Sequence, residues 1–336
     1  MVPETLRWEN GKLFLVDQGK LPFAVEYVMC ATADDVVSAI KNMTVRGAPA
    51  IGVAAAYALV LAAAHSTDFN KAASALADSR PTAVNLMWSV RRMTLLYNSL
   101  ADGNADEIYY SMEKEAIKIH REDIEINRKI GYYGASLLPH NAAVITHCNA
   151  GALATAGYGT ALGVLRAAAE AGKNIKIYAD ETRPRLQGGQ LTSYELCEDG
   201  FDVTVITDSM ASFIMANNKI DAVITGADRV AANGDTANKI GTYGLAVAAK
   251  YHGVPFYVAA PLSTFDTEYE TGRKIPIEER DGDEIRVVGG RRIIPEKIKV
   301  WNPSFDVTPH GLISGIITEC GIIREPYEKN ICELFK

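Results

Sequence analysis

The sequence lacks the cysteine and histidine motifs that mark zinc proteins and disulfide-linked proteins. It contains no CxxC pair, no HExxH motif and no paired cysteine and histidine cluster, so we expect no metal site. Its five cysteines are scattered and odd in number, and we find no signal peptide. We therefore expect reduced thiols in a cytoplasmic protein. The cysteines are Cys30, Cys148, Cys197, Cys320 and Cys332.

Long apolar runs and blocks of basic residues are also missing. The longest apolar run, Ala48–Ala64, contains Pro49 and Gly52 and is shorter than the ~20 residues that a membrane span needs. It predicts a buried helix rather than a membrane protein. Acidic and basic residues are mixed along the chain, which has a net charge of −7, and this argues against nucleic-acid binding. Isolated cations of this kind suit a small anionic ligand.

The common nucleotide-binding loops are absent or misplaced. No GxxxxGK[ST] loop occurs. Gly157, Gly159 and Gly163 are followed by Asp180, as in a dinucleotide-binding fingerprint, but Gly157 lies nine positions after Cys148. The fingerprint needs its first glycine in the turn directly after a strand. We therefore expect these glycines inside a helix, where they would allow close packing.

The chain has 336 residues and is 48% hydrophobic, enough for a large core and about two domains. Residues 1–125 predict an N-terminal domain with a small β-hairpin followed by helices. Asn10-Gly11 is a strong hairpin signal, and Thr32 can cap the first helix. The expected strands are Leu6–Glu9, Lys12–Val16 and Phe23–Met29. The expected helices are Thr32–Met43, Ala48–Ala64, Lys71–Asp78, Ala83–Leu100 and Ala105–Ile130.

Residues 126–336 predict a second domain, in which short apolar strands alternate with helices. This alternation indicates an α/β fold with a parallel sheet covered by helices on both faces. We assume the common strand order 3-2-1-4-5, which the sequence cannot show. The expected strands are Ala142–Thr146, Ile175–Ala179, Val203–Ile206, Ala222–Thr225 and Phe256–Ala259. The expected helices are Ala152–Ala171, Gly189–Asp199, Met210–Asn217 and Thr242–His252.

Reactive side chains follow the ends of the first and fourth of these strands. Ligands of open parallel sheets bind beyond the carboxyl ends of the strands, so Cys148 and Asp228 would face one crevice. A helix start after Cys148 would favour its thiolate, although a lone cysteine is more often a small buried hydrophobe. Burial would raise the pKa of Asp228 and suit it to acid–base chemistry, although it could also cap a turn.

Several other residues are candidates for binding an anion. Lys239 and Asn238 lie near an expected helix start, and Arg46-Gly47-Ala48 precede Pro49 at another. Arg91 and Arg92 lie on one helix about 100° apart, so at most one should reach a shared site. Gln187 belongs to the loop of residues 181–188, which could cover a ligand. Each could instead be an ordinary surface or loop residue.

Five blocks in this order resemble the methylthioribose-1-phosphate isomerases, a family related to the regulatory subunits of translation initiation factor 2B. The similarity runs from about Leu6 to Tyr327. One departure is Gly188-Gly189-Gln190, where relatives often carry Gly-Ala-Arg. The blocks are Arg46-Gly-Ala-Pro-Ala-Ile-Gly52, Asn85-Leu-Met-Trp88, Cys148-Asn-Ala-Gly-Ala-Leu-Ala-Thr155, Glu181-Thr-Arg-Pro184 with Leu186-Gln-Gly188, and Gly226-Ala-Asp-Arg229 with residues 233–242.

The resemblance implies a helical N-terminal domain, a Rossmann-like C-terminal domain and a homodimer. It implies Cys148 as the catalytic cysteine and Asp228 as the proton donor, with no metal or organic cofactor. The expected substrate is the sugar phosphate 5-methylthioribose 1-phosphate, and 5-deoxyribose 1-phosphate would also fit. Ribose-1,5-bisphosphate isomerase and a non-catalytic initiation factor 2B subunit are the alternatives. The implied substrate contacts are Arg46, Gly47, Ala48, Arg92, Gln187, Asn238 and Lys239.

Overall fold

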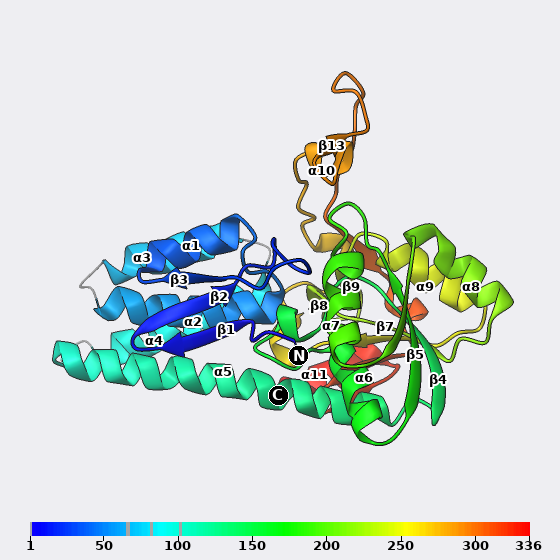
Figure 1. The fold of residues 1–336 in the computed structure, drawn as a ribbon. Helices are drawn as coiled ribbons and strands as arrows, with labels where there is room; N and C mark the ends of the chain where they lie inside the picture. Colours follow the sequence, from blue (N-terminus) through cyan, green and yellow to red (C-terminus); the bar gives the residue numbers. More distant parts are fainter. Residues whose placement is uncertain (1, 65–67, 81–82, 101–102) are drawn as a thin grey trace.

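We describe the fold from a computed structural model, which describes residues 2–64, 68–80, 83–100 and 103–336 (Figure 1). The N-terminal part combines an antiparallel sheet in the order β1-β2-β3 with five helices that the structure describes. Its strands are β1 (Leu6–Glu9), β2 (Lys12–Val16) and β3 (Tyr27–Cys30). Its helices are α1 (Ala33–Lys41), α2 (Ala48–Ala64), α3 (Phe69–Ser79), α4 (Val84–Ser99) and α5 (Ala105–Ala135).

Local sequence signals set the start of this region. The first two strands have the predicted bounds, with Asn10 and Gly11 at positive φ in the turn between them. Thr32 caps α1 through a capping box, in which its side chain accepts from Asp35 N–H and the Asp35 carboxylate accepts from Thr32 N–H. The third strand begins at Tyr27 rather than at the predicted Phe23, whose side chain is 94% exposed.

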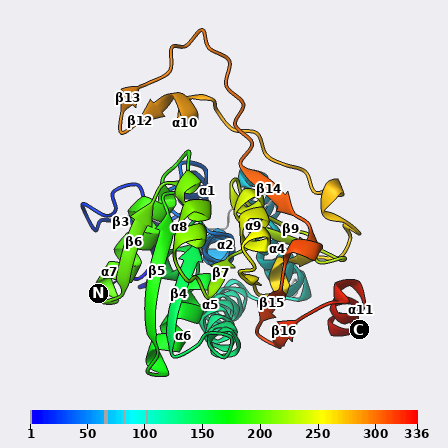
Figure 2. The same cartoon turned by 90° about the vertical axis from the view of Figure 1, so that its right-hand side faces the viewer.

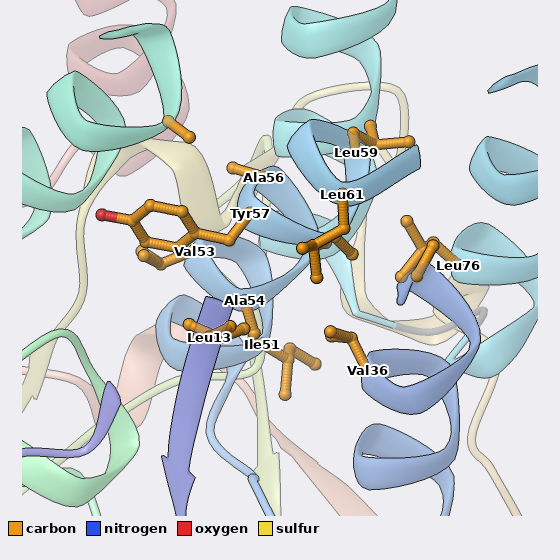
Figure 3. Packing of buried hydrophobic residues seen from close by; sticks show 14 of the residues in the cluster. Leu13, Val36, Ile51, Val53, Ala54, Ala56, Tyr57, Leu59, Leu61 and Leu76 are labelled. Carbon is orange, nitrogen blue, oxygen red and sulfur yellow. The ribbon is translucent and has the colours of Figure 1, made fainter. Parts of the chain in front are cut away.

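Helix α2 is the centre of the N-terminal core. All of its residues from Ala50 to Ala62 are buried, and the other N-terminal helices and the β1-β2-β3 sheet pack around it (Figure 3). Small alanine side chains let these neighbours approach on every side, so the helix is apolar all round. No helix among the described residues is both long and apolar enough to span a membrane.

The C-terminal part is built on a larger sheet in the order β16-β15-β10-β7-β4-β5-β6. The pairings from β15 to β6 are parallel, and β16 runs antiparallel to β15. The assumed order of the five predicted strands is confirmed, since β6-β5-β4-β7-β10 is 3-2-1-4-5. The strands are β4 (Asn141–Thr146), β5 (Asn174–Asp180), β6 (Asp202–Ile206), β7 (Ala222–Thr225), β10 (Phe256–Ala259), β15 (Gly315–Thr318) and β16 (Gly321–Ile323).

Helices cover both faces of this sheet, as the alternating pattern predicted. Val144 and Ile145 of β4 belong to different core clusters, because successive strand residues point to opposite faces. One cluster contains α8 (Ala211–Asn217), α9 (Thr242–Tyr251) and α11 (Tyr327–Leu334), and the other contains α6 (Ala161–Glu170), α7 (Ser193–Glu198) and the end of α5. Helix α5 runs from Ala105 to Ala135, so the predicted domain boundary at 125/126 falls inside it (Figure 1). The same helix packs on α2 of the N-terminal part and on α6 of the C-terminal part.

A second, smaller sheet and a projecting arm complete the described fold. The small sheet has the order β11-β8-β9-β14, with β8 (Arg229–Ala231), β9 (Thr236–Lys239), β11 (Phe265–Asp266) and β14 (Phe305–Thr308). The arm contains α10 (Asp283–Arg286), β12 (Val287–Val288) and β13 (Arg291–Arg292), and it extends away from the body in both views (Figures 1 and 2). Strands β8 and β9 of this sheet follow β7 in the chain, and the end of β9 lies at the same pocket as the ends of β4 and β7.

One predicted helix start, at Ala152, is wrong, whereas the start predicted at Thr242 is confirmed. The helix predicted to begin at Ala152 is a short 3₁₀ turn followed by a loop, and α6 begins only at Ala161. Gly159 lies in that loop at φ 93°, where a Cβ would sit 2.6 Å from Gly151 Cα, so it serves a backbone crossing rather than helix packing. Helix α9 begins at Thr242 as predicted, and Lys239, three residues before it, is the last residue of strand β9.

Candidate active site

The ends of two neighbouring strands bring Cys148 and Asp228 to one pocket. Strand β4 pairs with β7, and the two residues follow these strands at the same edge of the sheet. Both line a pocket of about 100 Å³ between the main sheet, the small sheet and the first turn of α2. The predicted thiol and carboxyl group therefore share one small cavity. Both residues are half-buried, so the cavity shields them from most of the surrounding solvent.

The pocket also contains most of the predicted substrate contacts. Its wall includes six of the seven residues, which reach it from the start of α2, the loop after β5 and strand β9. Among the described residues these six are Arg46, Gly47, Ala48, Gln187, Asn238 and Lys239.

Arg92 is the predicted contact that the structure does not place there. Its guanidinium lies on α4, 2.6 Å from Glu115 and 2.5 Å from Glu122 of α5, and stacks near Trp88. Arg91 lines a separate groove beside α4 and also does not line the pocket. The motif identified the helix, but the helix presents this arginine to α5 because two carboxylates lie there.

Cys148 is held in an unusual backbone conformation. Its φ is 67°, and its N–H donates to Thr182 Oγ1 at 2.9 Å while its carbonyl accepts from Thr192 Oγ1 at 2.6 Å. The side-chain amide of Gln187 donates to the Cys148 sulfur at 3.3 Å. These contacts fix the direction of the thiol, and a left-handed conformation at a residue with a Cβ often marks a functional position.

The thiol is not activated in the way that the sequence suggested. Burial raises the pKa of Cys148, although the nearby Lys239 ammonium opposes this increase. No long helix begins after Cys148 to lower the pKa, since α6 starts thirteen positions later at Ala161. The Lys239 charge across the pocket, rather than a helix start, is therefore what favours the thiolate form.

Asp228 has the raised pKa that its position predicted. Burial is the main cause, and it outweighs the opposing charges of Lys239, Arg80 and Arg280. A carboxyl group with a raised pKa can donate its proton to a substrate oxygen. The pocket thus presents a carboxylic acid and a thiol on adjacent strand ends.

Asn238 and Lys239 are the last two residues of strand β9, a short distance before α9 begins at Thr242. Lys239 Nζ donates to the carbonyl of Ser304 at 2.8 Å and lies 4.4 Å from the centre of the Phe305 ring. Burial lowers its pKa, while Cys148 and Asp228 partly oppose this change. Asn238 is fixed by Thr242, whose hydroxyl accepts from its side-chain amide at 2.9 Å. Both side chains are therefore held in position before any ligand binds.

Glycines let two loops approach the pocket closely. Gly47 has φ 99°, and a Cβ there would sit 2.4 Å from the backbone of Ala154, so the loop before α2 requires glycine. A Cβ on Gly188 would lie 1.7 Å from the carbonyl oxygen of Asp180. This contact fixes the loop that carries Gln187 against the end of β5. The departure at Gln190 has no effect on the wall described here, because Gln190 is exposed and does not line the pocket.

Three arginines line the pocket that the sequence analysis did not predict as ligand contacts. Arg80 follows α3, Arg280 precedes the projecting arm, and Arg185 belongs to the loop after β5 and pairs with Glu284 at 2.7 Å. The Nε atoms of Arg80 and Arg185 are buried with no partner among the described residues, so they can donate to an anion. Only Arg185 had a sequence signal, because its loop was a candidate cover. Arg80 and Arg280 reach the site from segments with no motif.

A buried cluster behind Cys148 offers ligand atoms of the kind that metals bind. His147, Asp180 and Asp208 place one nitrogen and two oxygens within 4.8 Å of one another. These groups already have hydrogen-bond partners. His147 Nδ1 lies 2.9 Å from Asp180, and the Asp208 carboxylate accepts from the N–H groups of Thr182 and Arg183. The hydrogen bonds are sufficient to explain why these polar groups are buried together.

Comparison with known proteins identifies the family. Residues 44–325 match the model of the initiation factor 2 subunit family. The chain is 55% identical to the methylthioribose-1-phosphate isomerase of Carboxydothermus hydrogenoformans, with 99% of both chains covered, and 54% identical to that of Thermotoga maritima, covering 99% and 98%. The chain belongs to the initiation factor 2 subunit family, in its methylthioribose-1-phosphate isomerase branch.

Solved structures support the same assignment. The 5-methylthioribose 1-phosphate isomerase of Pyrococcus horikoshii superimposes with a TM-score of 0.93 at 45% identity, covering 99% of this chain and 96% of that one. A chain described as translation initiation factor eIF-2B subunit delta, from A. fulgidus, superimposes with a TM-score of 0.87 at 45% identity, with 99% of both chains covered. Proteins with this fold thus include one named as an isomerase and one named as a translation initiation factor. The residues of the pocket are the evidence that can distinguish these two functions for this chain.

Proposed function

We propose that this chain is an aldose–ketose isomerase that converts 5-methylthioribose 1-phosphate to 5-methylthioribulose 1-phosphate, as part of methionine salvage. The names of its isomerase relatives support the substrate. The observation that carries the chemistry is the shared pocket, in which Cys148 and Asp228 face buried cations. An initiation factor subunit that only binds partners would not need a thiol and a carboxylic acid directed into one small cavity.

The substrate requires ring opening before isomerisation. Its anomeric carbon C1 carries the phosphate, so no free aldehyde can form. In the proposed mechanism Asp228 donates its proton to the ring oxygen as the bond from C1 to that oxygen breaks, leaving a cation at C1. The raised pKa of Asp228, caused by burial, keeps this proton available.

Cys148 then moves the second proton. Its thiolate removes the proton from C2, and the released electron pair forms the double bond between C1 and C2. The proton returns to C1, and the C2 hydroxyl gives its proton to the Asp228 carboxylate as the C2 carbonyl forms. Both groups recover their starting protonation, and the route uses no metal or organic cofactor. Lys239 supports the thiolate because its positive charge opposes the rise in the Cys148 pKa that burial causes.

The phosphate is retained, and the cations of the pocket hold it. We assign this role to Arg46, Lys239 and the backbone at Gly47 and Ala48, with Asn238 and Gln187 on the sugar hydroxyls. The Oε1 atom of Gln187 is buried and has no hydrogen-bond partner among the described residues, so it can accept from a hydroxyl. Arg92 would join this set only if α4 turned it away from its two carboxylates. Positioning of this kind can lower the barrier by several kcal/mol.

Ribose 1,5-bisphosphate is the second candidate substrate. Arg80, Arg185 and Arg280 also line the pocket, and their positive charges favour a bisphosphate. Glu284 and Glu278 pair with Arg185 and Arg280, which reduces this surplus charge. Met43, Pro49 and Pro261 in the same wall favour an uncharged 5-substituent such as a methylthio group. The test incubates purified protein with each substrate and follows the ketose by proton NMR. Conversion of the methylthio substrate alone supports the proposal, and conversion of the bisphosphate alone would replace it.

The remaining features of the proposal concern the assembly. We infer a cytoplasmic homodimer whose subunits divide near residue 125 into a helical domain and a catalytic domain. Exposed apolar side chains on β6, α8 and α9 support a dimer contact, among them Val205 at 45%, Phe213 at 64% and Tyr251 at 85% exposure. Light scattering after size-exclusion chromatography tests the dimer. A monomeric mass at micromolar concentration would contradict it.

A further inference from the structure

His147 precedes Cys148, and its ring is almost completely enclosed. The side chain is 1% exposed, and each ring nitrogen has one hydrogen-bond partner. Nδ1 lies 2.9 Å from Asp180 Oδ2, and Nε2 lies 2.9 Å from the carbonyl oxygen of Ile240. Gly241 accommodates the ring, because a Cβ there would lie 2.8 Å from His147 Cε1. A substitution at Gly241 would therefore displace the imidazole.

The partners of the ring determine its protonation. A backbone carbonyl can only accept, so Nε2 must carry a hydrogen. The contact between Nδ1 and Asp180 also needs one hydrogen, on either the ring or the carboxyl group. Imidazole is the stronger base, with a usual pKa of about 6.5 against about 3.9 for an aspartate, so the ring holds it. These usual values favour an imidazolium paired with the Asp180 carboxylate.

The charges around the ring favour this form. Asp180 faces it from β5, Asp208 Oδ1 lies 4.0 Å away after β6, and Asp306 of β14 also interacts with it. Burial by itself lowers the pKa of His147, but the hydrogen bond and the charge of Asp180, together with Asp208, raise it overall. Burial also raises the pKa of Asp180, and the hydrogen bond and charge of His147 oppose that increase. We place the shared proton on the ring because three carboxylates surround it. Lys239 on β9 is the nearby cation, and it interacts with Asp306 as well.

The bonds of this ring join the segments that carry the proposed active site. Its backbone leads directly into Cys148, and Ile240 directly follows Asn238 and Lys239. Asp208, the more distant carboxylate, accepts from Thr182 N–H at 2.8 Å and so fixes the start of the loop that carries Gln187. Through its contacts with Asp180 and Ile240, the imidazole connects the ends of β4, β5 and β9 behind the pocket.

We propose that His147 is a positioning residue, whose doubly protonated ring ties the end of β4 to the end of β9 and so sets Lys239 opposite Cys148. The ring does not contact the substrate, because it lies behind the pocket wall and is not part of the lining. This inference rests on the proposed isomerase function for its kinetic readout. Its structural part, the proton on each nitrogen, can be tested without any substrate.

Two amide variants separate the two hydrogen bonds. In His147→Asn the amide nitrogen stands near the Nδ1 position, so it keeps the bond to Asp180 and loses the bond to Ile240. His147→Gln places its nitrogen near the Nε2 position and does the reverse. We expect His147→Asn to raise the Michaelis constant for 5-methylthioribose 1-phosphate about tenfold, with a smaller change in kcat, and His147→Gln to raise it less than threefold. His140→Asn, at an exposed loop histidine, is the control and should change neither constant.

The pattern of these constants decides the kinetic part of the proposal. A merely structural role predicts that both variants lose stability and that their soluble fractions keep normal constants. That result, or equal Michaelis constants for the two variants, would overturn the proposal.

Nitrogen-15 NMR of histidine-labelled wild-type protein tests the protonation and remains available if the variants fail to fold. We expect both ring nitrogens of His147 to carry a hydrogen at pH 7.5. A single protonated nitrogen at that pH would overturn the proposal. If the wild-type protein does not convert the substrate, the proposed function fails, and binding of inorganic phosphate by calorimetry then replaces the kinetic comparison. Weaker phosphate binding by His147→Asn than by His147→Gln is then the expected result, and equal binding would contradict it.

Discussion

The hydrophobic core around α2 serves stability, whereas the core of the large sheet also positions reactive residues. Around α2, side chains such as Leu59 and Leu61 belong to a large hydrophobic cluster, and the helix lines the pocket only at its first turn. In the large sheet, strands of similar apolarity end in polar residues, so one edge of the sheet carries Cys148 and Asp228. The comparison shows that a fully buried apolar helix stabilises the fold through contacts on every side. An open parallel sheet instead leaves its strand ends free to carry reactive side chains.

Truncation in the helical core is the largest expected change in stability. Leu59→Ala should lower the free energy of unfolding by about 2–5 kcal/mol, because the side chain is fully buried and α2 has neighbours on every side. The activity of each remaining folded molecule should not change. Chemical denaturation with a parallel rate assay measures both, and Leu95→Ala, at a side chain that is 66% exposed, is the control. A loss of specific activity in Leu59→Ala would show that the two cores are coupled.

Substitution at the strand ends should have the opposite effect. Cys148→Ser and Asp228→Asn should each lower kcat about a hundredfold or more, equivalent to about 2.7 kcal/mol, while the protein stays folded. Steady-state kinetics with circular dichroism would check this. A near-normal rate in either variant would remove that residue from the mechanism.

Removal of the buried cation should mainly affect binding. Lys239→Ala should raise the Michaelis constant about tenfold with a smaller change in kcat, because the ammonium is proposed to hold the phosphate in both the ground and transition states. Lys219→Ala provides the control, since the Lys219 side chain is 83% exposed. Equal constants in the two variants would show that Lys239 does not bind the substrate.

The raised pKa of Asp228 also predicts how stability depends on pH. The folded protein holds this proton to a higher pH than the unfolded chain, whose aspartate pKa is about 3.9. The side chain therefore costs stability as pH rises from about 4 through its folded pKa. Asp228→Asn should unfold at a higher temperature than the wild type at pH 7, and the difference should shrink toward pH 4. Thermal scans would measure this, and a constant difference would contradict the raised pKa.

The smallest expected effect concerns Arg92. With its guanidinium held by Glu115 and Glu122 on a partly exposed surface, Arg92→Ala should lower the free energy of unfolding by about 1 kcal/mol or less. Its Michaelis constant should change less than threefold. A tenfold increase would instead show that α4 moves and delivers this arginine to the substrate. The kinetic assay already described distinguishes the two outcomes.

The sequence determined most of the framework. The strand Phe256–Ala259 and the cap at Thr32 were predictable, because a buried parallel strand is a short apolar run and a capping box depends on residues three apart. The position of Cys148 and Asp228 at one sheet edge followed from the strand order, which parallel α/β sheets commonly adopt.

The tertiary structure alone decided which cations meet in the pocket. Arg80 and Arg280 lie far apart in the chain and have no motif, while Arg92 has a motif but turns toward α5. Lys239 reaches the pocket from strand β9, whose pairing with β14 the sequence analysis did not predict. Local patterns determine elements through near neighbours in the chain, whereas the direction of a long charged side chain depends on the carboxylates and carbonyls that distant segments place around it.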